Sequence, residues 1–280
     1  MIKKINTIII IFLLLFLNGC RKYDNFLCIN IIDVGQGDCI LVSTPDKKNI
    51  LIDAGDENSE KIVKSYLKHH KIKKLDVIIA THLDKDHIGS LDYIIDNFKV
   101  DKIYTPNQID NSTHYNNLIK SCKDKNLKIN YLSKGDNISF TKDINLSVLS
   151  PSYISQDNNP NSIVLNLRYI NMDFLFTGDC EESNELDMIN SYNLEDVDFL
   201  KIAHHGSSSS STDNFIKEVS PTIGVISCGY KNQYGHPHKS TLDTLRKYSV
   251  ATYRTDHSGD LVFYCDGNKI FTTKKYNQTS

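Results

Sequence analysis

Four side chains able to bind metal ions lie within six consecutive positions: His82, Asp84, Asp86 and His87. They follow residues 75–80, which are apolar except for Asp76 and predict a buried strand. At the end of such a strand, two imidazoles and two carboxylates are costly neighbours without a cation, and natural ligands with one. The alternative, a set of surface charges on a strand-to-helix loop, explains this density poorly. The spacing therefore predicts a metal site.

Further candidate residues stand in short motifs along the chain. The motifs are DVGQGD at 33–38, LIDAG at 51–55, FTGD at 176–179, LKIAHHGS at 200–207 and YGHP at 234–237. In the first motif, Gly35 and Gly37 permit a tight turn, and Gln36 and Asp38 are placed to brace a metal loop. A purely structural turn explains the same residues. Each motif alone is a weak signal.

Taken in this order, the motifs resemble the metallo-β-lactamase superfamily over most of residues 26–260. The family signature is His, x, His, x, Asp, His at the position of residues 82–87. Asp84 stands where the second histidine usually lies, as in the competence-protein branch of the superfamily. The resemblance implies an αββα sandwich, a centre of two divalent metals and hydrolytic activity.

The resemblance also assigns ligands to the two metals. His82 and Asp84 would bind the first ion, and Asp86 and His87 the second. Asp179 would bridge both ions with one carboxylate. Asp86 counts among the catalytic residues as well as among the ligands.

One of two adjacent histidines should complete the ligand set. We favour His205, because it directly precedes Gly206, as the last ligand does in related motifs of the family. His204 would then support the ligands or contact the substrate, and it is a candidate catalytic residue.

Other residues are expected around the ligands. Asp53 resembles the family's structural aspartate, which orients the ligand loop by hydrogen bonding, and Asp38 would support that loop. Asn161 occupies the region where many members of the family supply another histidine. His236 is a candidate for gripping a phosphate or protonating a leaving oxygen, against the alternative of an ordinary loop histidine.

The ligand set bears on the metal and on the reaction. Asp84 in place of a histidine makes the site richer in oxygen and more negative, which predicts manganese as well as zinc. Two such ions lower the pKa of a water molecule enough for attack at neutral pH, and they neutralise charge that builds up on the substrate. A carboxylate-rich site of this kind suits phosphoesters.

The leading functional hypothesis is hydrolysis of a phosphodiester, such as single-stranded DNA, outside the cell membrane. The resemblance to the competence-protein branch supports it. One alternative is hydrolysis of a small extracellular phosphoester, an amide or a lactam. Another is a non-catalytic lipoprotein associated with DNA uptake, although a pure binding module has no need of the full ligand set. No feature of the sequence demands a protein partner.

Strands and helices alternate along the chain in a pattern typical of an α/β fold. Apolar patterning predicts strands at residues 26–33, 39–43, 49–53, 75–80, 102–104, 129–132, 138–141, 144–149, 163–176 (a hairpin), 197–203, 223–228, 252–255, 261–265 and 270–273. Helical spacing predicts helices at 59–69, 91–98, 117–125, 182–192, 212–219 and 242–248. Two mixed sheets packed face to face, with outer helices, accommodate this order.

The charge balance limits how the protein can hold a polyanion. The 280 residues include 32 Lys and Arg and 34 Asp and Glu, and loss of residues 1–19 would leave 30 basic side chains against 34 acidic ones. A protein that binds nucleic acid mainly by non-specific phosphate contacts usually has a basic excess. Any such binding must therefore come from a local patch or from the metals.

The first residues are typical of an export signal. Lys3 and Lys4 precede the apolar run 8–17, which is too short to span a bilayer comfortably. The sequence then resembles the bacterial lipobox, which ends at Cys20. We predict three segments: a lipoprotein signal peptide at 1–19, a lipidated cysteine and tether at 20–25, and a hydrolase domain at 26–280. The lipid would hold the protein at the outer face of the cytoplasmic membrane; an uncleaved anchor is the alternative.

Overall fold

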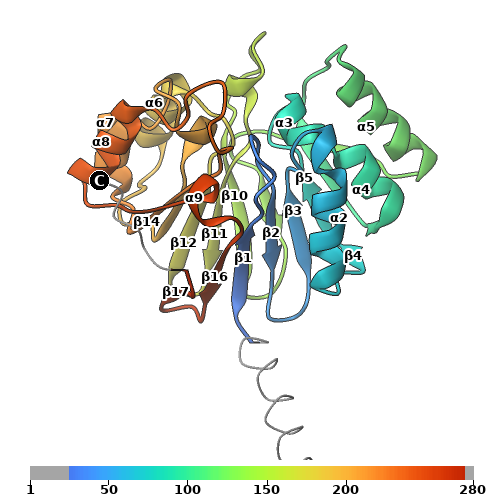
Figure 1. Cartoon of the computed structure of the whole chain (residues 1–280), viewed down its shortest axis with the longest axis horizontal. Helices are drawn as coiled ribbons and strands as arrows, with labels where there is room; N and C mark the ends of the chain where they lie inside the picture. Colours follow the sequence, from blue (N-terminus) through green and yellow to red (C-terminus); the bar gives the residue numbers. More distant parts are fainter. Residues whose placement is uncertain (1–24, 275–280) are drawn as a thin grey trace, which may run out of the picture.

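Two mixed sheets pack face to face, with helices against the outer face of each (Figure 1). The computed structural model describes residues 25–274. The arrangement is the αββα sandwich that the sequence predicts. Cys20 and the predicted signal peptide, residues 1–19, lie outside the described residues. Within the described part of the chain, no helix combines the length and the apolar character needed to cross a bilayer.

The strands form two large sheets and one short pair. The eight-stranded sheet has the order β17-β16-β1-β2-β3-β5-β7-β8, with bounds β1 (Leu27–Ile31), β2 (Ile40–Ser43), β3 (Asn49–Ile52), β5 (Val77–Ile79), β7 (Ile103–Pro106), β8 (Ile129–Leu132), β16 (Leu261–Cys265) and β17 (Ile270–Thr272). The seven-stranded sheet has the order β15-β14-β13-β12-β11-β10-β9, with bounds β9 (Asn137–Ser139), β10 (Ile144–Ser150), β11 (Val164–Tyr169), β12 (Met172–Phe176), β13 (Phe199–Lys201), β14 (Ile223–Ile226) and β15 (Ala251–Arg254). The short pair is β4 (Lys74–Leu75) and β6 (Lys99–Val100).

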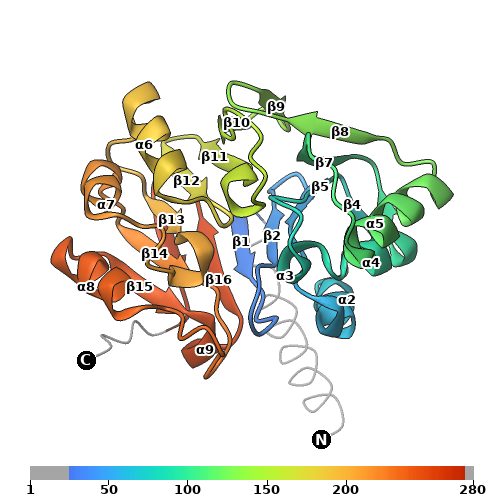
Figure 2. The same ribbon diagram turned by 90° about the horizontal axis from the view of Figure 1, so that it is seen from above.

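Helices lie on the two outer sides of the sandwich (Figures 1 and 2). One group is α2 (Glu60–His69), α3 (Lys85–Ile88), α4 (Leu91–Asn97) and α5 (Thr113–Asp124). The other is α6 (Glu182–Ser191), α7 (Asp213–Val219) and α8 (Lys239–Lys247), and α9 (Thr255–Ser258) joins β15 to β16. Helix α5 begins earlier than the predicted 117–125, because the Ser112 hydroxyl accepts a hydrogen bond from the Tyr115 N–H at 3.2 Å and caps the helix there.

Strand β3 shows why strands at the middle of the sandwich are apolar on both faces. In β3, Ile50 and Ile52 belong to the core between the sheets, whereas Leu51 packs with the helices of the outer layer. Phe199 of β13 joins the same central core from the opposite sheet. Because successive side chains of a strand point to opposite faces, a strand covered on both sides must be apolar throughout. Burial of these side chains holds the two sheets together.

Parallel strands bring distant loops to one edge of the sandwich. β3, β5 and β7 run parallel in one sheet, and β12 to β15 run parallel in the other. The loops after β3, β5, β12 and β13 carry Asp53, residues 82–87, Asp179 and the pair of His204 and His205. Carboxyl ends of parallel strands are where open α/β sheets place their ligands. The fold therefore collects candidate ligands from separate motifs.

Candidate metal centre

The loop after β5 presents its histidines and Asp84 to one another. His82 and His87 are fully buried, and their ring centroids lie 4.0 Å apart. Asp84 precedes α3 with an extended backbone, and its carboxylate makes no capping hydrogen bond to that helix. The carboxylate turns toward His82, with 3.5 Å between Asp84 Oδ2 and His82 Nε2.

Residues from the second half of the chain complete the cluster. Asp179 Oδ1 lies 3.4 Å from His87 Nε2, and Asp179 Oδ2 lies 3.4 Å from His205 Nε2. The distance from His205 Nε2 to Asp86 Oδ2 is also 3.4 Å. The two oxygens of one carboxylate thus face two different imidazoles. Asp179 therefore joins the cluster through both of its oxygens.

Several buried ligand atoms in the cluster have no hydrogen-bond partner among the described residues. They are His82 Nε2, His87 Nε2, His205 Nε2 and Asp179 Oδ1. Ligand atoms of His82, His87 and Asp179 lie within 4.8 Å of one another, and so do those of Asp86, His87 and His205. A buried polar atom without a partner is costly. The residues present therefore fit a divalent metal centre with imidazole and carboxylate ligands.

Asp53 holds the ring of His87 in place. Its Oδ2 lies 2.8 Å from His87 Nδ1, and it also accepts a hydrogen bond from the Thr81 hydroxyl at 2.7 Å. Asp53 Oδ1 accepts the Thr81 backbone N–H at 2.8 Å. Because Asp53 engages Nδ1, His87 presents Nε2 to the cluster. Asp53 lies where the predicted orienting aspartate should be.

A buried ion pair supports the other side of the cluster. The side chains of Asp38 and Lys201 are 2% and 0% exposed, and Lys201 Nζ lies 2.7 Å from Asp38 Oδ2. Asp38 Oδ1 lies 3.5 Å from His205 Nδ1, and the Asp38 N–H donates to the Asp86 carbonyl oxygen at 3.2 Å. A Cβ on Gly37 would lie 2.4 Å from that same oxygen, so this close approach requires glycine.

The two adjacent histidines occupy different positions. His205 is buried, and its Nδ1 lies 2.9 Å from the Ser227 carbonyl oxygen, which leaves Nε2 for the cluster. His204 is partly exposed, with its Nε2 3.8 Å from Asp179 Oδ2. Both residues have left-handed backbones, with φ of 48° and 54°, and non-glycine residues adopt that conformation only at a cost. The strained turn directs His205 into the cluster and leaves His204 at its rim.

His236 covers the cluster from the loop after β14. Its ring stacks on that of His205, with 6.2 Å between centroids and 29° between planes, and lies 5.5 Å from the ring of His204. Its buried Nδ1 has no hydrogen-bond partner among the described residues. Burial and the neighbouring histidines lower the pKa of His236 to about 4. The ring is therefore neutral near pH 7, which suits a contact to phosphate better than proton donation.

Asn161 shapes a loop beside Asp84. Its amide accepts the Ser155 N–H at 2.6 Å and donates to the carbonyl oxygens of Ser155 and Asp157 at 3.1 and 3.0 Å. The same loop carries Asn158, whose amide donates to Asp84 Oδ1 at 2.5 Å. Asn161 thus acts on Asp84 indirectly, by fixing the loop that carries Asn158.

The charges of the cluster stabilise one another. Burial alone would raise the pKa of Asp86, but His205 and His87 lower it to about 2. Burial would also raise the pKa of Asp179, and the same two imidazoles hold it well below its usual range. In turn, Asp179 raises the pKa of both histidines against the opposing effect of burial. The carboxylates therefore need positive charge beside them, which a divalent cation would supply.

Comparison with known proteins agrees with this geometry. A sequence model of the Metallo-beta-lactamase superfamily matches residues 32–230. The chain belongs to this superfamily. Among solved structures, the metallo-beta-lactamase fold protein YhfI from Bacillus subtilis is similar, with a TM-score of 0.56 and 13% identity over 85% of this chain and 99% of that chain. That likeness shows the fold.

Two curated relatives are competence-related members of the superfamily, as the motifs predict. The chain is 30% identical to ComE operon protein 3 of Bacillus subtilis over 281 residues, which cover 94% of this chain and 36% of that protein. It is 29% identical to competence protein ComA of Neisseria gonorrhoeae over 245 residues, 86% of this chain and 32% of that protein. The chain thus spans about a third of the length of these relatives.

Two supporting residues were missed by the sequence reasoning. Thr81 lies directly before the 82–87 cluster, and its hydroxyl links Asp53 to the ligand loop. Lys201 lies in LKIAHHGS, between apolar residues of a buried strand. A charged side chain in such a strand needs a buried partner. The sequence therefore already indicated that Lys201 pairs with a buried acidic residue.

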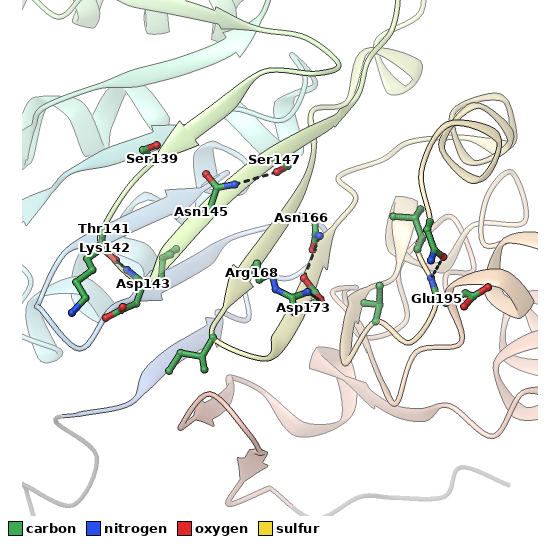
Figure 3. Close-up of a pocket in the computed structure, with 15 residues that line it drawn as sticks. Ser139, Thr141, Lys142, Asp143, Asn145, Ser147, Asn166, Arg168, Asp173 and Glu195 are labelled. Atoms are coloured by element: carbon green, nitrogen blue, oxygen red, sulfur yellow. Dashed lines mark hydrogen bonds and ion pairs between the residues drawn. The ribbon is translucent and has the colours of Figure 1, made fainter.

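A polar groove of about 660 Å³ lies elsewhere, on the outer face of β9 to β12 (Figure 3). Its walls include Asn145, Ser147 and Arg168, which alternate along β10 and β11 with side chains of the central core. Arg168 pairs with Asp173 at 2.5 Å. None of the candidate ligands lines this groove.

Proposed function

We propose that this protein is a metal-dependent phosphodiesterase. The observation that carries the proposal is the set of buried ligand atoms without hydrogen-bond partners, which belong to His82, His87, Asp179 and His205. Asp84 and Asp86 lie against two of these histidines and make the ligand set rich in carboxylate oxygen. Such a set suits hard divalent ions and substrates whose phosphate oxygens the ions can bind.

The residues divide into two ligand groups. As the resemblance implies, His82 and Asp84 would hold one ion and Asp86 and His87 the other, with Asp179 shared between them. His205, 3.4 Å from Asp86, would join the second group. Two ions of manganese or zinc would activate a water molecule and neutralise charge that builds up on the phosphoester.

The surrounding residues hold the ligand side chains in position before metal binds. Asp53 fixes the ring of His87, and the Ser227 carbonyl oxygen fixes that of His205. Asp38 links the loop of His204 and His205 to the loop of residues 82–87, because it contacts both His205 and Asp86. The ligands therefore need little rearrangement when metal binds, which favours both affinity and catalysis.

His236 and His204 are placed to handle the substrate. Both lie beside the cluster: the ring of His236 is stacked on that of His205 and lies 5.5 Å from that of His204. In this role His236 binds and orients the phosphate above the ligands. His204, 3.8 Å from Asp179, would hold the substrate from the other side of the same rim.

Single-stranded DNA outside the cell membrane is the substrate we favour. Similarity to competence proteins supports this choice, and the lipobox-like sequence at Cys20 supports attachment to the membrane by lipid. The net charge of −2 gives no general attraction to a polyanion. The metal centre and local contacts must therefore supply the affinity for the strand.

The test uses the full chain in detergent, depleted of metal with a chelator and reloaded with Mn²⁺ or Zn²⁺. We expect two bound ions per chain and turnover of bis(p-nitrophenyl) phosphate and of a labelled oligothymidylate. Asp124→Asn, an exposed change on α5, serves as the control and should match the wild type. Bound metal without turnover of any diester would indicate a binding protein, and turnover of a chromogenic lactam alone would indicate an amide hydrolase; either result would overturn the proposal.

A further inference from the structure

An exposed tyrosine lies beside the metal centre, connected to it by stacked rings. Tyr234 is 53% exposed. Its ring stacks on His236, with 5.7 Å between centroids and 24° between planes. His236 in turn stacks on His205. Tyr234 therefore stands two ring contacts from a candidate ligand, with more than half of its side chain open to solvent.

Hydrogen bonds fix the loop that carries this tyrosine. Asn232 Oδ1 accepts the backbone N–H groups of Tyr234 and His236 at 3.2 and 3.0 Å. Asn232 Nδ2 donates to the carbonyl oxygens of Gly229 and His236 at 3.0 and 2.6 Å. His238 adds a contact of 3.2 Å from its Nε2 to the Tyr234 carbonyl oxygen. A loop held in this way loses little conformational freedom when a ligand stacks on the ring that it carries.

The exposed ring fits the chemistry of a nucleobase. Every base has a flat π-face, and proteins that bind single strands without sequence preference use aromatic side chains as stacking platforms. Such a platform is needed here because the chain has no general basic excess to hold phosphates. The same loop also carries a cation, Lys231. Its Nζ lies 5.2 Å from the ring centroid of the neighbouring Tyr230.

We propose that Tyr234 is the stacking platform for a base next to the scissile phosphate of single-stranded DNA. The proposal rests on the phosphodiesterase function above and adds a specificity element to it. The phosphate would lie over the ligand cluster beside His236, and the adjacent base would cover the open face of Tyr234. The protein would then prefer strands with bases over strands without them, whatever the base.

Binding of strands that resist cleavage to the metal-loaded protein tests the platform independently of hydrolysis. The probes are a fluorescein-labelled decathymidylate and a decamer of abasic tetrahydrofuran nucleotides, both with phosphorothioate linkages, and fluorescence anisotropy in Mn²⁺ gives each Kd. We expect the wild type to bind the thymidylate roughly 5- to 150-fold more tightly than the abasic strand, the range for one base–aromatic stack. Tyr234→Ala should abolish the preference, and Tyr234→Phe should keep it.

Tyr131 provides a matched control, because it is also 53% exposed but lies on β8 at the far edge of the eight-stranded sheet (Figure 2). Tyr131→Ala should bind both strands as the wild type does. Equal binding of the two strands by wild type, or an undiminished preference in Tyr234→Ala, would overturn the platform. If the preference is present but the metal-loaded protein cuts no diester, the phosphodiesterase function fails and the base platform remains. If the protein cuts the strand but shows no base preference, the base platform fails and the phosphodiesterase function remains.

Discussion

Lys201→Met should destabilise the fold strongly, because it leaves the carboxylate of Asp38 buried without its cation. The two side chains are 0% and 2% exposed and lie 2.7 Å apart. Removal of one member of a buried ion pair typically costs about 3–5 kcal/mol, mostly from the unpaired charge that remains. For a chain of this size each kcal/mol lowers the melting temperature by about 2–4 °C. We therefore expect the melting temperature to fall by roughly 6–20 °C.

The assay is thermal and urea unfolding, followed by circular dichroism in a chelator, so that bound metal adds nothing to stability. Lys120→Met is the matched control. Lys120 also pairs with an aspartate, Asp124 at 2.6 Å, but both side chains are mostly exposed, and no detectable change is expected. The double variant Lys201→Met with Asp38→Asn should recover part of the lost stability, since no unpaired charge is left in the interior. A Lys201→Met protein as stable as the wild type would refute the reasoning.

The other predictions concern the metal centre and the attachment of the protein to the membrane. Asp179→Asn should keep the fold, measured by circular dichroism, but lose metal from both ligand groups and reduce diester turnover by several orders of magnitude, because one carboxylate serves both; two retained ions with normal turnover would mean that Asp179 is not the bridge. His236→Ala should lower turnover while bound metal, measured by elemental analysis, stays at the wild-type level; a metal loss like that of His82→Ala would make His236 a ligand. Cys20→Ala should release the protein from the membrane or leave an uncleaved precursor, as seen by fractionation and mass; membrane retention at full-length mass in the wild type would indicate a plain anchor.

The sequence predicted most of the elements because each depends on local patterning. Residues 49–53 and 75–80 each contain three consecutive aliphatic residues, and the strands β3 and β5 lie within them. Their ends were less certain, since caps decide them: α5 begins at Thr113 because of the hydroxyl of Ser112. The short helix α3 falls inside the ligand loop, where no apolar periodicity marks it.

The density of His and Asp in residues 82–87 was enough to predict a metal site from the sequence alone, because such side chains are costly neighbours at the end of a buried strand without a cation. The order of the motifs was enough to indicate the family. The resemblance favoured His205 over His204, but it gave no physical reason for that choice. The choice depends on backbone φ near 50° at both residues and on the position of Ser227, and these are set by β13 and β14 lying side by side.

The sequence by itself therefore determined the family and the candidate ligands, because residue identity and spacing are local properties of the chain. Only the tertiary structure decided which atoms meet. It paired Lys201 with Asp38, residues far apart in the sequence, and placed the ring of His236, on which Tyr234 stacks, against His205. Such contacts arise when two sheets pack and their loops share an edge, so their distances depend on the whole core and not on any one segment.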